Sequence, residues 1–123
     1  ASTAAFQPGP WMSVYYATKA YVLHFSEGLA EELRPRGVQV SVLCPGATVT
    51  EFAETAGVQK SKLFNSKILR PATAESVAVY GVNKFLKGKT IIIHGALNKF
   101  LAFGNRFTAR AITRKIAGYL NRR

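Results

Sequence analysis

A helix-length pattern followed at once by a strand-length run most constrains how this chain can fold. Residues 14–33 form the helical pattern, and residues 34–37, Arg-Pro-Arg-Gly, end it because proline cannot continue a helix. Residues 38–43 are β-rich and have the length of a strand. A second helical pattern at residues 73–88 precedes a second strand at residues 90–94. The unbroken isoleucines of that strand suit a parallel sheet that is buried on both faces.

Within the first helical pattern, Tyr15 and Lys19 are four residues apart and therefore share one face of the helix. A free tyrosine is a poor proton donor and acceptor at neutral pH, because its pKa is about 10. A neighbouring ammonium group would favour the phenolate and bring the phenol toward acid–base chemistry. Taken alone, this spacing is weak evidence for a proton-transfer pair. The alternative is that Tyr15 is a packed ring beside the solvated charge of Lys19. Tyr16 has no such partner, because the residue four positions on is Ala20.

Two further motifs accompany this pair. Ser2 lies 13 residues before Tyr15, and the run Pro-Gly-Ala-Thr-Val-Thr at residues 45–50 begins 26 residues after Lys19. In this order and spacing, the serine, Tyr-x-x-x-Lys and strand-Pro-Gly-x-x-x-Thr motifs closely resemble the short-chain dehydrogenase/reductase family. The helix and strand pattern up to residue 95 fits the same family.

The resemblance implies an α/β fold, in which residues 1–95 are the catalytic half of a doubly wound, parallel-sheet, Rossmann-like domain. In the family the first half of that domain carries a Gly-rich dinucleotide-binding turn, and this sequence has no comparable turn. The chain also opens at Ala1 without methionine, so we expect a C-terminal half whose dinucleotide-binding half is absent. Such a segment is expected to be inactive alone, and a truncated product without activity is the alternative to an enzyme. Residues 96–123 are expected to form a basic amphipathic helical tail.

The resemblance also implies an activity and gives roles to particular residues. The family transfers hydride between a nicotinamide cofactor and a substrate carbonyl or alcohol carbon. Tyr15 would exchange the proton, Lys19 would stabilise the phenolate and bind the nicotinamide ribose, and Ser2 would orient the substrate oxygen. A fourth catalytic group of the family, an asparagine, would lie upstream of Ala1. The cofactor would be NADP or NAD, with NADP slightly favoured.

Other candidate residues lie in the loops beside these motifs. Backbone groups near Thr48 would hold the nicotinamide carboxamide, and the Thr50 hydroxyl would contact the cofactor near its phosphates. Gly46 would let the backbone approach a ligand closely. The expected cofactor-binding residues are Tyr15, Lys19, Pro45, Gly46, Thr48 and Thr50. Candidate walls of the substrate pocket are Trp11, Met12 and Phe52, with plain packing under the loop as the alternative for the first two.

The positive charge of the chain is unevenly placed. The formal net charge is +11, and residues 76–123 contain ten lysines or arginines and no acid. Such asymmetry suggests an anionic partner, and a solvated basic surface is the alternative. The tail could lie on an anionic membrane, or its apolar stripe could cover the core or a subunit interface, which we favour. No nucleic-acid-binding signature and no zinc spacing is present, so neither nucleic acid nor metal is expected.

The remaining expectations concern partners and compartment. The helix at residues 14–33 is apolar on more than one side, which predicts burial on more than one side. In the family the corresponding helix packs against a second subunit, which implies a homo-oligomer, and the substrate would be a small carbonyl or alcohol compound. The single cysteine, Cys44, excludes an intramolecular disulfide and fits a reducing compartment. We expect a cytoplasmic protein that could also be membrane-peripheral.

Overall fold

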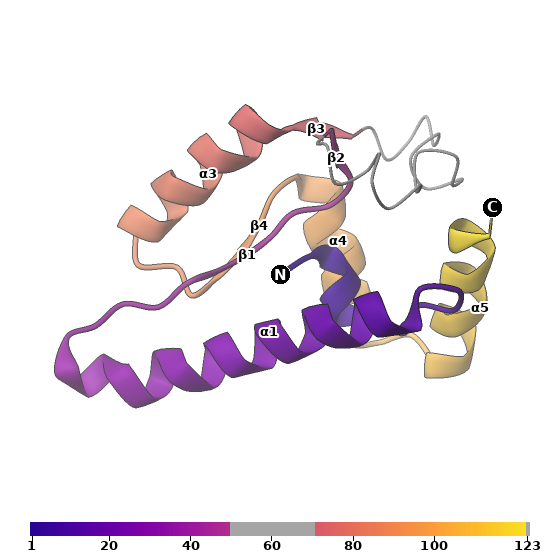
Figure 1. Cartoon of the computed structure of the whole chain (residues 1–123), viewed down its shortest axis with the longest axis horizontal. Helices are drawn as coiled ribbons and strands as arrows, with labels where there is room; N and C mark the ends of the chain where they lie inside the picture. The colour runs from indigo at the N-terminus through magenta and orange to yellow at the C-terminus, as the bar shows by residue number, and fades with distance from the viewer. Residues whose placement is uncertain (50–70, 123) are drawn as a thin grey trace.

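The computed structural model describes residues 1–49 and 71–122, which form helices packed around short parallel strands (Figure 1). Two 3-10 helices lie in the first third of the chain, η1 at Thr3–Phe6 and η2 at Arg34–Arg36. The α-helices are α1 (Ser13–Leu33), α3 (Ala74–Leu86), α4 (Ala96–Gly104) and α5 (Arg110–Asn121). The strands are β1 (Val42–Cys44), β2 (Thr48–Val49), β3 (Ala72–Thr73) and β4 (Ile91–Ile93). The fold is therefore α/β, as the sequence predicts.

The described strands pair in parallel. β1 pairs with β4 in the register Val42–Ile91, and β2 pairs with β3 in the register Thr48–Ala72. The extended start of the chain runs beside the other edge of β1, where the Ala1 nitrogen donates to the Leu43 carbonyl at 2.9 Å. The Thr3 N–H donates to the Pro45 carbonyl, also at 2.9 Å, and this two-residue step is that of a parallel ladder. The start of the chain therefore runs parallel to β1.

The first strand is shorter than predicted. We expected a strand over residues 38–43, whereas β1 covers only Val42–Cys44. The partner strand begins level with Val42, whose N–H donates to the Thr90 carbonyl at 2.7 Å. Before that point Ser41 Oγ donates to the Lys89 carbonyl at 2.7 Å, and Gln39 donates a side-chain hydrogen bond to the Phe85 carbonyl. Residues 38–41 are thus tied to the α3–β4 connection by side chains and form no ladder.

Helix α1 begins and ends within one residue of the predicted bounds, but it buries only one face. Tyr16, Leu23 and Ala30 recur every seven residues along the buried side. Val14, Tyr21 and Phe25 on the other sides are 78%, 69% and 56% exposed. Within this chain α1 is therefore buried on one side, and burial of a second side against another subunit stays a prediction (Figure 1).

The second helix–strand unit follows local sequence signals closely. Thr73 is the N-cap of α3, and its hydroxyl accepts a hydrogen bond from the Ser76 N–H at 3.2 Å, as predicted. β4 is where predicted, and Ile92 is 3% exposed in the core. Ile91, however, is 36% exposed. The expectation that this strand is covered on both faces is therefore wrong for the described residues.

The core is small and centres on β1. Ala5 from η1, Leu23 from α1, and Val42 and Cys44 from β1 form its buried cluster. Cys44 is 0% exposed, and burial raises the pKa of its thiol. Cys44 thus packs as a small apolar residue of the core.

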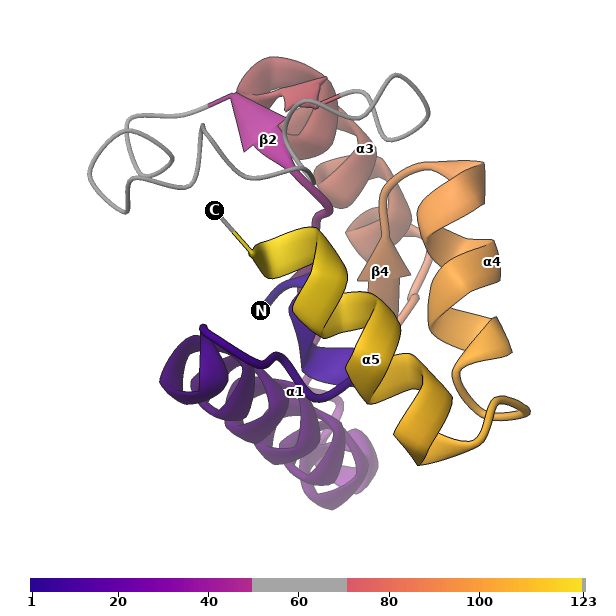
Figure 2. The same ribbon diagram turned by 90° about the vertical axis from the view of Figure 1, so that its right-hand side faces the viewer.

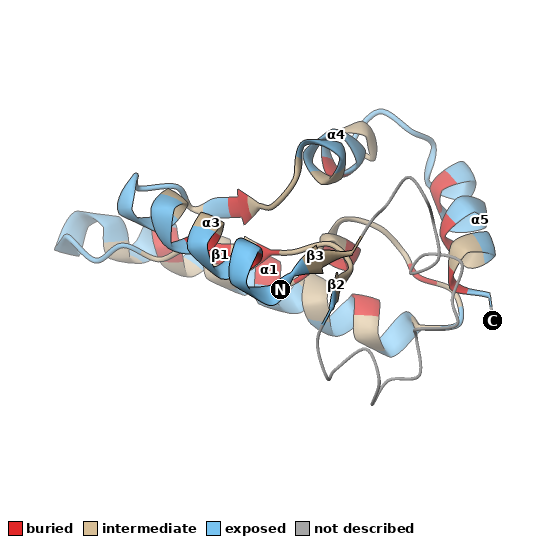
Figure 3. Cartoon of the chain, turned by 90° about the horizontal axis from the view of Figure 1, so that it is seen from above, coloured by how far each residue is buried: buried red, intermediate tan, exposed pale blue. Residues whose placement is uncertain are grey.

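The tail forms two helices separated just after Gly104, as predicted, but α5 is oriented differently from our expectation. Its buried residues are Thr113, Ala117 and Asn121, and buried positions recur along one side of α5 in Figure 3. Ile112 and Ile116 are 53% and 54% exposed. In α5 the apolar stripe therefore does not cover the core of this chain, and its burial in a subunit interface stays a prediction. In the described part of the chain, no helix is long and apolar enough to cross a bilayer.

Candidate active site

The sequence-predicted residues Ser2 and Pro45 lie at the same edge of the parallel strands. Ser2 is in the extended segment beside β1, and Pro45 directly follows β1. The hydrogen bond from Thr3 N–H to the Pro45 carbonyl joins the two segments. η1 then packs against α1, the helix that carries Tyr15 and Lys19. Ligands of open α/β sheets bind beyond this carboxyl edge, so the placement suits a ligand site.

Ser2 is held by its role as a helix cap. It is 9% exposed, its backbone is extended, and its Oγ accepts a hydrogen bond from the Ala4 N–H at 3.2 Å. Serine is a favoured residue at such positions because its oxygen satisfies an otherwise unpaired N–H. A hydroxyl has one O–H donor besides its acceptor lone pairs, so this contact leaves the O–H able to donate. Ser2 is thus fixed in place and chemically able to orient a substrate oxygen.

Tyr15 and Lys19 lie together on the first turns of α1, as their spacing predicts. The Lys19 Nζ is 5.3 Å from the centroid of the Tyr15 ring, which is a cation–π distance. Both side chains are half-buried. The ammonium group therefore lies where it can stabilise negative charge on the phenol.

Tyr16 lies on the neighbouring, buried face of α1, with its ring centroid 6.0 Å from that of Tyr15. It is 7% exposed, and its Oη donates to the Asn121 Oδ1 at 3.2 Å. Burial raises the pKa of Tyr16, against the smaller lowering effect of the hydrogen bond to Asn121. Its ring packs against Gly9 so closely that a Cβ at Gly9 would overlap it. The sequence carries no signal for this anchor, because Tyr16 and Asn121 are 105 residues apart.

The loop between Gly9 and Ser13 presents Trp11 to solvent. Trp11 is 75% exposed and has a φ of 68°, the left-handed region that a bulky residue rarely adopts. Plain packing under the loop, the alternative reading for Trp11, is therefore wrong. Met12 is half-buried and is the N-cap residue of α1. A strained, exposed indole just before the helix that carries Tyr15 and Lys19 suits a ligand-contacting role, since such strain often occurs at functional sites.

The Pro-Gly loop is held by a residue that the sequence analysis missed. A Cβ on Gly46 would collide with the side-chain amide of Asn98 in α4, and Asn98 Nδ2 donates to the His94 carbonyl at 2.9 Å. Gly46 therefore makes room for a side chain of this chain, whereas we expected it to make room for a ligand. Thr48 is half-buried, and its Oγ1 donates to the Gly46 carbonyl at 3.0 Å. Thr50 and Phe52 lie outside the described residues.

A groove of about 610 Å³ lies on the other side of the Gly9 loop. Residues of η1, α1 and α5 line it, among them Tyr16, Arg110 and Arg114. Ser2, Tyr15 and Lys19 do not line this groove. It is therefore distinct from the substrate pocket expected beside the predicted catalytic residues.

Comparisons with known proteins point to one family. The family model described as short chain dehydrogenase matches residues 1–61. The uncharacterized oxidoreductase YghA of Escherichia coli (strain K12) is 30% identical over 101 residues, which cover 76% of this chain and 34% of that protein. Dehydrogenase/reductase SDR family member 4 of Homo sapiens is 33% identical over 106 residues, covering 76% and 37%. Serine 3-dehydrogenase of Agrobacterium fabrum (strain C58 / ATCC 33970) is 38% identical over 79 residues, covering 63% and 32%.

The chain thus spans about a third of the length of these curated relatives. The matched segment covers between 32% and 37% of each of them. No solved structure matches the chain significantly. The relatives bear the names of oxidoreductases and dehydrogenases, and their similarity extends over most of residues 1–122 in the longest matches. The chain belongs to the short-chain dehydrogenase family of oxidoreductases.

Proposed function

We propose that the protein containing this chain is an NAD(P)(H)-dependent oxidoreductase that interconverts a carbonyl and an alcohol. The observation that carries the proposal is the Tyr15–Lys19 pair, with the ammonium 5.3 Å from the ring centroid. It lies on the helix against which η1 and its Ser2 cap pack. The names of the relatives, two of which are dehydrogenases, support the same class of reaction.

Each of the three side chains has one task in this proposal. In the reducing direction Tyr15 donates its phenolic proton to the carbonyl oxygen, and in oxidation it takes a proton from the alcohol. Lys19 stabilises the phenolate that remains after donation. Ser2 donates its O–H to the substrate oxygen and holds it beside the phenol. The nicotinamide, when bound, supplies or accepts the hydride, so that one hydride and one proton convert the carbonyl to the alcohol.

In this proposal the nicotinamide end of the cofactor would bind at the carboxyl edge of β1. The residues that we propose to hold it there are Pro45, Gly46 and Thr48, joined by Lys19 at the ribose and by Thr50 near the phosphates. Backbone groups are the fitting donors and acceptors, because the Thr48 hydroxyl is already bonded to the Gly46 carbonyl. Residues upstream of Ala1 would complete the cofactor site and set the choice between NADP and NAD. Residues 1–95 would then be the catalytic half and residues 96–123 a tail, in a reducing compartment such as the cytoplasm.

Assaying the full-length protein for NADPH and NADH oxidation with a panel of aldehydes and ketones tests this function. We expect turnover with one of the two cofactors, and loss of about a hundredfold in kcat for Ser2→Ala. Ser26→Ala is the matched control, because the Ser26 hydroxyl only bonds within α1, to the Val22 carbonyl. Absence of both cofactor binding and turnover would rule the function out. The 123-residue chain alone is expected to be inactive.

We further propose that the exposed side of α1 pairs with a second copy of the protein. Tyr21 and Phe25 stack with ring centroids 6.0 Å apart and are more than half exposed, beside the exposed Val14. Exposed apolar patches of this kind mark interaction sites. Phe25→Glu is expected to shift the full-length protein toward monomer in light scattering after size exclusion. An unchanged mass would exclude α1 from the interface.

A further inference from the structure

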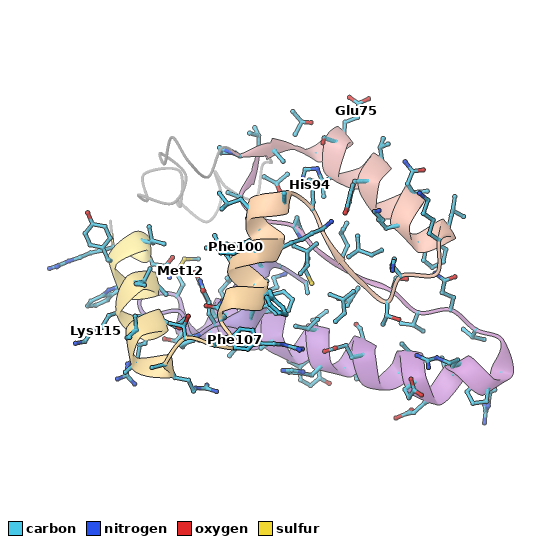
Figure 4. All side chains as sticks on the ribbon, turned by 180° about the vertical axis from the view of Figure 1, so that it is seen from behind. Met12, Glu75, His94, Phe100, Phe107 and Lys115 are labelled. Atoms are coloured by element: carbon cyan, nitrogen blue, oxygen red, sulfur yellow. The ribbon has the colours of Figure 1, made fainter. Side chains whose placement is uncertain are left out.

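Helix α5 turns its apolar side chains away from the protein. Ile112, Ile116 and Tyr119 are 53%, 54% and 62% exposed, whereas Thr113 and Ala117 are buried. With the neighbouring cations Lys115 and Arg122, the three exposed apolar residues form what we call the α5 outer face. Figure 4 shows Lys115 on the side of α5 away from α4. An amphipathic helix that packs through its polar and small residues is unusual, because burial of the apolar side is normally favoured.

Specific contacts hold the helix in this orientation. Asn121 is 5% exposed, accepts a hydrogen bond from Tyr16 Oη, and donates one through Nδ2 to the Pro10 carbonyl at 3.2 Å. The backbone at Gly118 lies so close to Pro10 that an added Cβ would be 3.4 Å from its Cγ. Figure 1 and Figure 2 show α5 beside the loop that leads into α1. Turning the apolar residues inward would break both Asn121 hydrogen bonds and leave buried polar groups unpaired.

The two charged residues of the α5 outer face, Lys115 and Arg122, are both cations. Residues 76–123 contain ten lysines or arginines and no acid. Among the described residues, the ion pairs involve α1 and the residue that follows it, His24 with Glu27 and Arg34 with Glu31. No described acid forms an ion pair with Lys115 or Arg122. A surface that combines exposed isoleucines and a tyrosine with cations suits an apolar partner that carries negative charge.

A second copy of the chain does not suit this face. A two-fold symmetric interface would bring Lys115 and Arg122 of one copy toward the same residues of the other, and like charges in close apposition are repulsive. No described helix is long and apolar enough to span a bilayer, so the contact is peripheral. Helix α5 has 12 residues and is about 18 Å long, enough to lie along a bilayer surface. Phe103 and Phe107, just before α5, are also exposed and add apolar surface to the same segment.

We propose that the α5 outer face docks on an anionic lipid bilayer, with Ile112, Ile116 and Tyr119 entering the headgroup region. Lys115 and Arg122 would contact lipid phosphates, as the long cationic side chains of interfacial helices do. Tyrosine is enriched at this depth of a bilayer because its ring is apolar and its hydroxyl is polar. Binding by one short helix is reversible and depends on the content of anionic lipid.

Co-sedimentation of the full-length protein with vesicles tests the proposal. The probes are vesicles of phosphatidylcholine alone and of phosphatidylcholine mixed with phosphatidylglycerol. One variant removes the apolar anchors, Ile112→Ser with Ile116→Ser, and a second reverses the charges, Lys115→Glu with Arg122→Glu. The matched control is Val79→Ser with Val82→Ser on α3, because these valines are 56% and 58% exposed and lie outside the proposed face. Circular dichroism of every variant establishes that the fold is retained.

We expect binding to the mixed vesicles and little binding to phosphatidylcholine alone. Each α5 variant should bind the mixed vesicles about tenfold more weakly, and the α3 control should bind as the unmodified protein does. Unmodified protein that fails to bind the mixed vesicles would overturn the proposal. So would equal binding by the α5 variants, or a dimer that these variants dissociate in the absence of lipid binding.

Discussion

Tyr15→Phe in the full-length protein is expected to lower kcat for carbonyl reduction by about two to four orders of magnitude. Phenylalanine keeps the ring that lies 5.3 Å from the Lys19 ammonium, so the packing of the first turns of α1 should survive. The substitution removes the phenolic hydroxyl, which is the proposed proton donor for the substrate oxygen. Steady-state kinetics with saturating cofactor measures the effect, and cofactor affinity determined by fluorescence titration should change little.

Tyr16→Phe is the matched control for that experiment, because it removes the neighbouring hydroxyl from the same helix. Tyr16 Oη bonds to Asn121, so its loss leaves a buried polar group without a partner and is expected to destabilise the fold by about 1–3 kcal/mol. The chemical step should be affected far less than by Tyr15→Phe. If Tyr15→Phe retains a near-native rate, or if Tyr16→Phe has the larger effect on kcat, the assignment of the proton donor is wrong.

Gly9→Ala is expected to give the largest loss of stability among the glycine substitutions, about 3 kcal/mol in the free energy of unfolding. A Cβ at this position would overlap the ring of Tyr16, which is rigid and buried and whose hydroxyl is bonded to Asn121. The ring cannot move aside without breaking that hydrogen bond. Chemical denaturation followed by circular dichroism measures the change.

Two further variants make the explanation specific. Gly28→Ala is the control, because a Cβ there meets nothing within 4 Å and alanine is the better helix former, by about 0.5–1 kcal/mol. It should stabilise the protein slightly. Combining Gly9→Ala with Tyr16→Ala should cost less than the sum of the two single changes, because alanine lacks the Cγ and Cδ atoms that the added Cβ would meet. Additive losses would show that Gly9→Ala acts through something other than the Tyr16 ring.

The parts of the fold that the sequence predicts well are those set by neighbours along the chain. The start and end of α1, the Thr73 cap of α3 and the break near Gly104 all follow from residues a few positions apart. The length of β1 does not, because it depends on where Thr90, 48 residues away, offers a carbonyl to Val42. The orientation of α5 likewise depends on residues far away in the sequence, so local patterns do not predict it. Hydrophobic periodicity favours burial of the isoleucines, whereas the distant partners of Asn121 decide otherwise.

In the candidate site, too, some features follow from local sequence and others depend on long-range contacts. The shared face of Tyr15 and Lys19 follows from helical geometry, and the structure places them together. The contact of Gly46 with Asn98 joins residues from different elements, and no local pattern announces it. The left-handed backbone of Trp11 is also unexpected, because tryptophan does not favour that conformation. Local sequence thus indicates which residues carry the chemistry, and long-range contacts determine how the loops around them are held.

The hydrogen bonds of Asn121 make the last turn of α5 a support for the loop that leads into α1. A force applied to the outer side of α5 is therefore transmitted to Pro10, next to Trp11. If lipid binding at α5 alters the affinity of this loop for a ligand, linkage requires the ligand to alter lipid affinity by the same factor. A purification tag or a truncation at the end of α5 would act on the same loop, through the two hydrogen bonds of Asn121.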